Sequence, residues 1–381
     1  MDRKDILRWR LQRTRLTKPA ATTPAETVRW LTAVQAQDYT GAKWGVGQRI
    51  ARASDALLEQ AFETGAILRT HLMRATWHFV SPEDIRWLLG LTAPRVIANS
   101  RPYYQQTELD EKDLAKSRAV LEKALAGGNY LTREEIAQAL AAAKIKASGL
   151  KLALLVMRAE LDAVICSGPR RGKQFTYALL DERAPKAKPL AREAALAELT
   201  RRYFESHGPA TAHDFAWWSG LNVSDAKRGV ELLGKKLSQA SLDGKTYVFS
   251  EPNFARRTTK SEVWLLPNYD EYMVAYKDRG EALAVAQQSK DFARERVLFL
   301  NIVVRDGLVV GSFRRANTKQ KLTLEVALLD RFDAEAIAAL ERAAERYASF
   351  LDLPLELRVK QVAGGAASTT LPQPRPRKGR S

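Results

Sequence analysis

A mixed α+β fold, mostly helical, is predicted by three features of the 381-residue chain. Segments with apolar residues at helical spacing dominate the first two thirds, and short β-rich runs joined by turn residues recur between them. Beyond residue 260, alternating apolar runs precede one long amphipathic helix over 334–351. The 45 % hydrophobic content supplies core for roughly two to four domains.

The N-terminal unit, residues 1–113, has the least regular pattern. Helices are predicted at 6–13, 25–34 and 55–65, a strand-like segment at 67–80, and a helix that Pro82 initiates. The run DYTG at 38–41 is expected to stop the second helix. We interpret this unit as an embellished version of the two that follow.

The second unit, residues 114–185, combines three helices with a hairpin. The helices are predicted at 113–127, 131–143 and 149–163, and Thr132 with Glu135 forms a capping box at the start of the second. Two β-rich runs over 164–180 enclose a basic, glycine-containing loop. Three helices and a hairpin make a winged helix, whose third helix enters the major groove of DNA.

The third unit, residues 186–255, repeats this order with an unrelated sequence. Helices are predicted at 189–208, 211–221 and 224–237, and Asp243-Gly244 turns a hairpin. Gly220 is expected to end the second helix and Ser224 to cap the third, as in a helix-turn-helix. An all-helical repeat is the alternative, but it would not need the hairpins.

The remaining chain divides at about residue 362. Strands at 263–276, 297–315 and 322–329 join the long helix in a small α+β region over 256–362. Residues 363–381 are rich in Gly, Ser, Thr, Pro and basic residues without core formers, which predicts a disordered basic tail.

Composition bounds the class of partner and the compartment. The formal net charge is +17 and the pI about 9.9, which predicts attraction to a polyanion, nucleic acid first. Basic termini could serve solubility alone, but RRGK at 170–173 and the arginine pairs at 256 and 314 continue the excess inside the folded part. The single cysteine, Cys166, rules out an internal disulfide and is expected to be a buried, inert thiol. Without an apolar run of membrane length, we expect a soluble cytoplasmic, nucleoid-associated protein.

Two carboxamides, Gln35 and Gln37, stand two residues apart at the end of the second predicted helix. Positions i and i+2 point about 200° apart on a helix but share a face in extended chain. The amides can therefore aim at one point only if the helix has already unwound. The alternative is a helix C-terminus capped by polar side chains.

Five stretches, in order along the chain, resemble the AlkZ/YcaQ-type winged-helix DNA glycosylases. They are AVQAQD at 33–38, LRTHLMRATWHFV at 68–80, HGPATAHDFAWWSGL at 207–221, LLPNYDEYMVAYKDR at 265–279 and RDGLVVGSFRR at 305–315. The resemblance implies three tandem winged helices forming a concave, positive cradle for duplex DNA, with a Gln-x-Gln motif as the catalytic element. Gln35 and Gln37 match the AlkZ-like branch. The other branch has Asp at the second position, and Asp38 falls one residue too late for it.

The resemblance implies a monofunctional alkylpurine DNA glycosylase that needs no cofactor, acts on duplex DNA containing alkylated bases and works as a monomer. A cationic N7-alkylpurine is already an activated leaving group, so a neutral carboxamide that places a water is chemically sufficient. The basic residues and the one histidine that we expect at the DNA are Arg69, Arg74, His78, Arg170, Arg171, Lys173, Lys227, Arg228, Arg314 and Arg315. His78 could line the lesion pocket or be a satisfied core histidine.

Other candidates point elsewhere. No metal site is expected, because His71 and His78 should lie on opposite strand faces with the other histidines remote. Asp270, Glu271 and Asp278 form an acidic cluster that braces neighbouring side chains or, alternatively, is catalytic. Trp217 and Trp218 are expected in the core. Two competing hypotheses remain: a winged-helix transcription regulator without catalytic activity, and a catalytically silent relative that binds damaged DNA.

Overall fold

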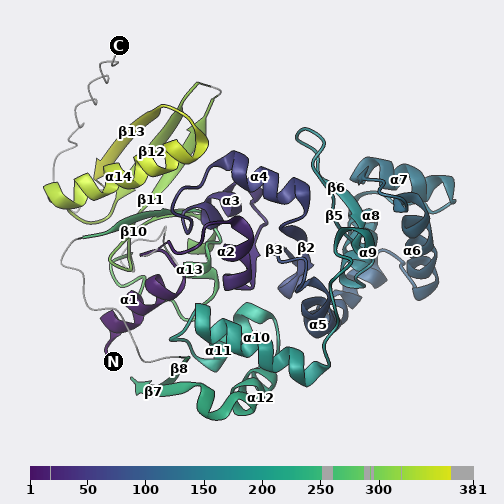
Figure 1. The fold of residues 1–381 in the computed structure, drawn as a ribbon, viewed down its shortest axis with the longest axis horizontal. Coiled ribbons are helices and arrows are strands. Elements are labelled where there is room, and N and C mark those ends of the chain that lie inside the picture. The colour runs from purple at the N-terminus through teal and green to yellow at the C-terminus, as the bar shows by residue number, and fades with distance from the viewer. Residues whose placement is uncertain (18, 251–260, 287–291, 293–295, 319, 362–381) are drawn as a thin grey trace. The chain divides into compact units, whose positions relative to one another are not determined.

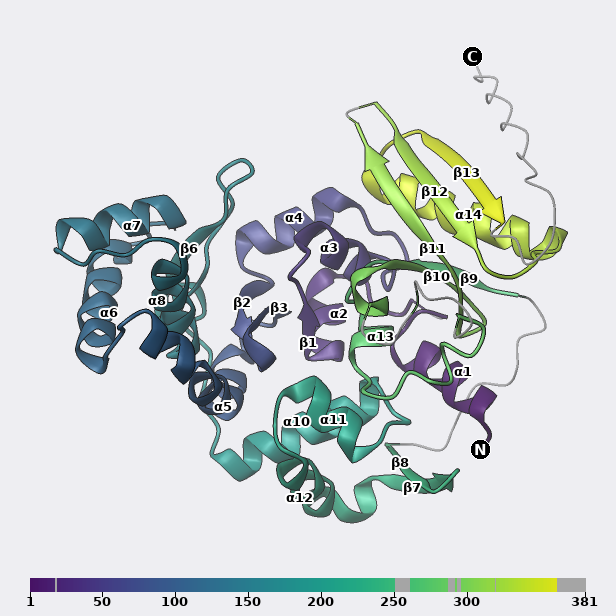
Figure 2. The same ribbon diagram turned by 180° about the vertical axis from the view of Figure 1, so that it is seen from behind.

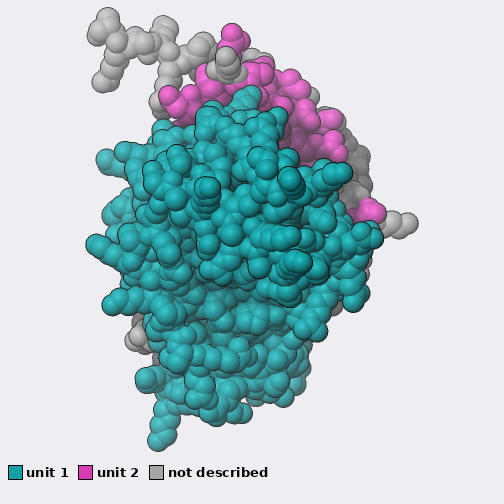
Figure 3. Space-filling model, turned by 90° about the vertical axis from the view of Figure 1, so that its right-hand side faces the viewer, with its two compact units in different colours: residues 1–256, 269–278 teal, residues 257–268, 279–381 magenta. Residues whose placement is uncertain are grey.

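The computed structural model describes residues 1–17, 19–250, 261–286, 292, 296–318 and 320–361, and it has a mixed α+β fold (Figure 1). The chain divides into two compact units, coloured separately in Figure 3. Unit 1 comprises Met1–Arg256 and Tyr269–Asp278, and unit 2 comprises Arg257–Asn268 and Arg279–Ser381. The predicted tail at 363–381 lies outside the described residues. The boundaries at 113 and 185 stay predictions, whereas Tyr269–Asp278 clusters with unit 1 and not with the C-terminal region.

The N-terminal part of unit 1 departs from the sequence prediction at the Gln-x-Gln segment. Helix α2 ends at Leu31, because Thr32 adopts a positive φ of 69°, and the chain continues as strand β1. The run DYTG does not end the second helix, which has already ended at Leu31. Instead Asp38 accepts a hydrogen bond from the Gly41 N–H and so begins helix α3. The elements here are α1 (Arg3–Arg13), α2 (Pro24–Leu31), β1 (Ala33–Gln35), α3 (Tyr39–Gly47) and α4 (Asp55–Thr64).

The segment at 67–80 is a hairpin and not a single strand. Arg74 and Ala75 have positive φ values of 55° and 57°, which reverses the chain between β2 (Leu68–Leu72) and β3 (Thr76–Val80) through the short helix η1 (Met73–Ala75). The sheet order is β1-β3-β2, and both pairings are antiparallel. Helix α5 (Ile85–Gln106) follows and contains Pro94 and Pro102.

The second predicted unit has its elements in the expected order, with the capping box of Thr132 and Glu135 confirmed. A short additional strand, β4, pairs with β6, so the sheet order is β4-β6-β5. The β5–β6 loop projects from its neighbours in both ribbon views (Figures 1 and 2). The elements are α6 (Glu111–Leu125), β4 (Leu131–Thr132), α7 (Arg133–Ala142), α8 (Gly149–Leu161), β5 (Ile165–Ser167), β6 (Thr176–Leu179) and α9 (Leu180–Arg183).

The third predicted unit also has the expected elements. Gly220 ends α11 in the left-handed region, and Asp243 and Gly244, both with positive φ, form the turn of the β7–β8 hairpin. Ser224 does not cap the third helix; Asn222 does, accepting from the Asp225 N–H at 2.6 Å. The elements are α10 (Arg192–Ser206), α11 (Ala212–Ser219), α12 (Val223–Leu233), η2 (Gly234–Lys236), β7 (Ser238–Leu242) and β8 (Lys245–Phe249).

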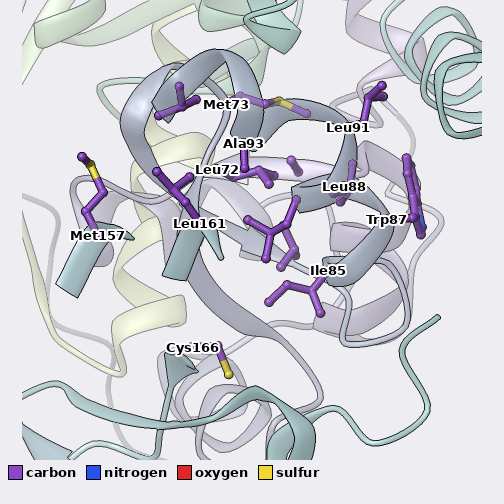
Figure 4. Packing of buried hydrophobic residues seen from close by; sticks show 14 of the residues in the cluster. Leu72, Met73, Ile85, Trp87, Leu88, Leu91, Ala93, Met157, Leu161 and Cys166 are labelled. Carbon is purple, nitrogen blue, oxygen red and sulfur yellow. The ribbon is translucent and has the colours of Figure 1, made fainter. Parts of the chain in front are cut away.

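A hydrophobic core runs through unit 1 around α5 (Figure 4). It joins residues of the β1-β3-β2 sheet to α8, α10 and α11, so one core supports all three predicted segments. Cys166 lies in this core with no exposed surface, which confirms the buried thiol, and burial raises its pKa to about 12.

The described residues of unit 2 form a five-stranded sheet of order β13-β12-β11-β10-β9, with α14 contacting β9 and β13. Within this sheet, β12 and β13 are the parallel pair, and α14 connects them. The strand predicted at 263–276 ends at Leu266, and α13 (Glu271–Val274) follows within unit 1. Among the described residues, no helix is long and apolar enough to cross a membrane. The elements are β9 (Val263–Leu266), η5 (Val297–Phe299), β10 (Asn301–Arg305), β11 (Leu308–Asn317), β12 (Leu322–Leu328), α14 (Ala334–Leu351) and β13 (Leu355–Gln361).

Candidate active site

The Gln-x-Gln motif begins at the end of β1, an edge strand of the β1-β3-β2 sheet, and ends in the bend that follows it. Gln35 ends β1 and is the register partner of His78 on β3. The next residue continues the pairing, because the Ala36 N–H donates to the Trp77 carbonyl at 2.7 Å. The motif is therefore not helical, as the two amides require, but the chain bends at Gln37, two residues after Gln35.

The two carboxamides differ in exposure. Gln35 is 7 % exposed, and its Oε1 is buried with no hydrogen-bond partner among the described residues. Gln37 is exposed, and its Oε1 is contacted only loosely by the Trp77 N–H, at 3.5 Å. A buried acceptor without a partner is costly, so it needs an explanation, and a catalytic role or a bound water is one.

Two acidic residues stand at the start of α13: Asp270 caps the helix and Glu271 is its first residue. Both carboxylates are bound by donors within the protein. Glu271 accepts from the Gln35 backbone N–H at 3.0 Å and from the Trp218 indole at 2.9 Å. Asp270 forms a two-pronged ion pair with Arg49, with both N–O distances 2.8 Å. These contacts agree with the bracing interpretation of the acidic cluster. Asp278, its third member, pairs instead with Lys245.

The histidine opposite Gln35 is a buried, neutral side chain. His78 is 1 % exposed, and burial, reinforced by the nearby Arg74 charge, lowers its pKa to about 4. Its Nδ1 lies 2.8 Å from the Thr76 carbonyl, so this nitrogen carries the proton. The geometry matches the satisfied core histidine that we considered, and a phosphate contact would need a charge that His78 does not carry near neutral pH.

Three of the arginines expected at the DNA are engaged within the protein. Arg69 is buried, donates from Nε to the Ala36 carbonyl at 3.1 Å, and lies over the rings of Trp77 and Phe175. Arg74 donates to the carbonyls at the C-terminus of α11. Arg170 pairs with Glu59 at 2.9 Å.

The other expected DNA-contacting residues lie nearer solvent. Arg171 pairs with Glu135, Arg228 with Glu193, and Arg315 with the Tyr347 hydroxyl. Lys173, Lys227 and Arg314 are exposed. Among the described residues, no group of three His, Cys, Asp or Glu side chains is placed to hold a metal ion.

Sequence reasoning was wrong about one tryptophan and incomplete about the acidic cluster. Trp218 is buried, as expected, but Trp217 is 36 % exposed and lies beside the Arg74 guanidinium. The contact between Glu271 and the Gln-x-Gln strand was missed, since the two are 236 residues apart. The only signal in the sequence was a charged pair beside an apolar run.

The comparisons with known proteins identify the class. A family model for DNA glycosylases matches residues 28–350, which is most of the chain. The chain belongs to this family, the AlkZ-like DNA glycosylases, whose members are hydrolases of damaged DNA.

One curated relative and one solved structure are similar over most of their length. A protein of Streptomyces sahachiroi, described as an interstrand DNA cross-link repair glycosylase, is 25 % identical over 329 residues, covering 81 % of this chain and 86 % of the relative. The structure of Streptomyces sahachiroi DNA glycosylase AlkZ matches with a TM-score of 0.76 at 21 % identity, covering 93 % of this chain and 98 % of that chain. This second likeness establishes a shared fold.

Proposed function

We propose that this protein hydrolyses the N-glycosidic bond of cationic alkylated purines, of the N7-alkylpurine type, in duplex DNA and leaves an abasic site. Gln35 and Gln37 carry the reaction. The observation on which this rests is that helix α2 ends before the motif, so Gln35 ends strand β1 and Gln37 follows in a bend, with Gln37 exposed and Gln35 holding a buried oxygen without a partner.

The chemistry needs little from the protein. The positive charge on an N7-alkylated base makes it a good leaving group, so no general acid is required. The Gln37 carboxamide, which reaches solvent, accepts a hydrogen bond from a water and orients it towards the anomeric carbon. The partnerless Gln35 oxygen is a fixed dipole for the positive charge that develops on the sugar, an effect that supplies several kcal/mol in preorganised sites.

The same proposal assigns the DNA-binding surface. The segments at 114–185 and 186–255 are two winged helices and the N-terminal part is a third, together forming a cradle for the duplex. The exposed Lys173, on the projecting β5–β6 loop, and Lys227, on α12, contact phosphates. Such contacts make affinity fall steeply with salt and leave sequence preference weak.

The substrate range includes bulky or crosslinked adducts. This part of the proposal rests on the relative from Streptomyces sahachiroi, whose name describes repair of interstrand cross-links. The exposure of Gln37 supports attack on a lesion that is too large for a closed pocket.

The test is base release from duplex DNA containing N7-methylguanine or a nitrogen-mustard adduct, with abasic sites revealed by alkaline cleavage. We expect the wild-type protein to release the base, and both Gln35→Ala and Gln37→Ala to lose most of this release while retaining DNA binding. Gln106→Ala, which removes an exposed carboxamide at the end of α5, is the matched control and should behave as wild type. Absence of release from every alkylated duplex, together with tight binding to one operator sequence, would favour the transcription regulator.

A further inference from the structure

We propose that Glu271 is a positioning residue for the reaction: its carboxylate holds the strand that carries Gln35. This inference rests on the proposed function, because it assigns a role to a residue that acts through Gln35.

The first step concerns the free edge of β1. In an antiparallel strand, successive N–H groups point to opposite edges. The Ala36 N–H is used by β3, so the Gln35 N–H points away from the sheet. It donates to Glu271 Oε1 at 3.0 Å. The carboxylate thus takes the place that a neighbouring strand would occupy.

The second step concerns what fixes the carboxylate. Glu271 is 1 % exposed, and its Oε2 accepts from the Trp218 indole N–H at 2.9 Å. His207 Nε2 lies 3.4 Å from the same oxygen, at ion-pair distance but without hydrogen-bond alignment. His207 is itself held, since its Nδ1 is 2.8 Å from Ser206 Oγ and its carbonyl accepts from the Tyr276 hydroxyl. The carboxylate is therefore hydrogen-bonded to α11 and lies beside His207, the residue that follows α10.

The third step concerns why β1 needs this anchor. The strand has only three residues and pairs along one edge, and Thr32, which precedes it, has a positive φ. Few hydrogen bonds consequently fix the direction of the Gln35 side chain. A charge-assisted bond to a buried, rigid carboxylate is stronger than a neutral one. Both carboxylate oxygens already accept from protein donors, so Glu271 acts through position and not as an acid or base on the substrate.

The experiment compares Glu271→Gln with wild type in single-turnover excision of N7-methylguanine. A carboxamide can accept from Gln35 with its oxygen, but its NH₂ then faces the Trp218 N–H, donor against donor. We expect the excision rate to fall roughly 10- to 100-fold through misplacement of the Gln35 side chain. Affinity for an undamaged duplex should stay within about twofold, because no phosphate contact is touched.

The control for removal of a buried carboxylate is Asp84→Asn. Asp84 is also buried and accepts from an indole N–H, that of Trp87, as well as from the Arg202 guanidinium, and none of its hydrogen bonds reaches β1. This variant should lose stability but keep an excision rate near that of wild type at a temperature where both are folded.

A double-mutant cycle separates positioning from general destabilisation. If Glu271 acts through Gln35, adding Glu271→Gln to Gln35→Ala should lower the remaining rate by less than about twofold. An equal loss in both backgrounds, or a Glu271→Gln variant as fast as wild type, would overturn the inference. Wild-type excision by Gln35→Ala alone would instead refute the proposed function, whatever Glu271 does.

Discussion

The buried ion pair between Arg49 and Asp270 gives the sharpest stability prediction. The two side chains are 1 % and 0 % exposed, and two N–O contacts of 2.8 Å join them. Arg49 also donates to the Thr14 carbonyl at 2.7 Å and to the Gly45 carbonyl at 2.5 Å, so it ties α3 to the end of α1. In Asp270→Ala the guanidinium remains buried with two neutral acceptors and no counter-charge.

Breaking such a pair by removing one partner costs about 3–5 kcal/mol. Asp270 also accepts from the Tyr272 N–H at 2.9 Å and so caps α13, but this loss overlaps with the first and is not simply added. We therefore expect the free energy of unfolding of Asp270→Ala to fall by about 3–5 kcal/mol.

The assay is urea unfolding followed by tryptophan fluorescence, with Arg118→Ala as the control. The Arg118–Glu122 pair is about half exposed on α6, and losing it should cost less than about 0.5 kcal/mol. Combining Asp270→Ala with Arg49→Met removes the orphaned charge and should recover part of the loss. A cost below about 1 kcal/mol for Asp270→Ala, or no recovery in the double variant, would refute the reasoning.

Three further outcomes are expected. In Gly229→Ala the new Cβ would stand 2.1 Å from Thr200 Oγ1, so overpacking between α10 and α12 should cost about 1–3 kcal/mol in urea unfolding, and Thr200→Ala in the same chain should relieve it. Folding lowers the pKa of His78 from 6.5 to about 4, so the contribution of His78 to stability is fully present above about pH 6.5 and decreases as the pH falls towards 4. In His78→Asn the urea midpoint should therefore depend less on pH over this window. An unchanged pH profile would contradict the burial argument. Lys173→Ala should weaken binding to all duplexes alike and reduce the slope of log K against log salt by about one, whereas an unaltered slope would remove Lys173 from the interface.

Much of the secondary structure follows from local sequence patterns. The prediction was correct where such a pattern permitted a single local structure. The capping box at Thr132 and Glu135 and the Asp243-Gly244 turn are each specified within a few residues, the 334–351 helix is specified by its continuous apolar periodicity, and the structure has all three. Predictions failed where two local readings competed. The run DYTG could stop a helix or, through Asp38, begin one, and only the chain geometry after Thr32 decides for the second.

The candidate site divides in the same way. The spacing of Gln35 and Gln37 is a property of the sequence, and so is the requirement that the chain be extended for both amides to share a face. The sequence does not determine which cationic side chains are available to contact DNA. Arg69, Arg74 and Arg170 are basic residues in the sequence, but in the fold they contact carbonyls, aromatic rings and a carboxylate of the protein.

By itself, therefore, the sequence determined the order of helices and hairpins in the second and third predicted units, the basic character of the chain and the chemistry available at one motif, because propensities, caps and charges are local quantities. Only the tertiary structure decided the surroundings of that motif. Glu271 meets the Gln35 backbone across 236 residues, and His78 loses its charge through burial. Such contacts arise when distant elements are packed into one core, and no local pattern specifies which of many charged residues will fill the free edge of a three-residue strand.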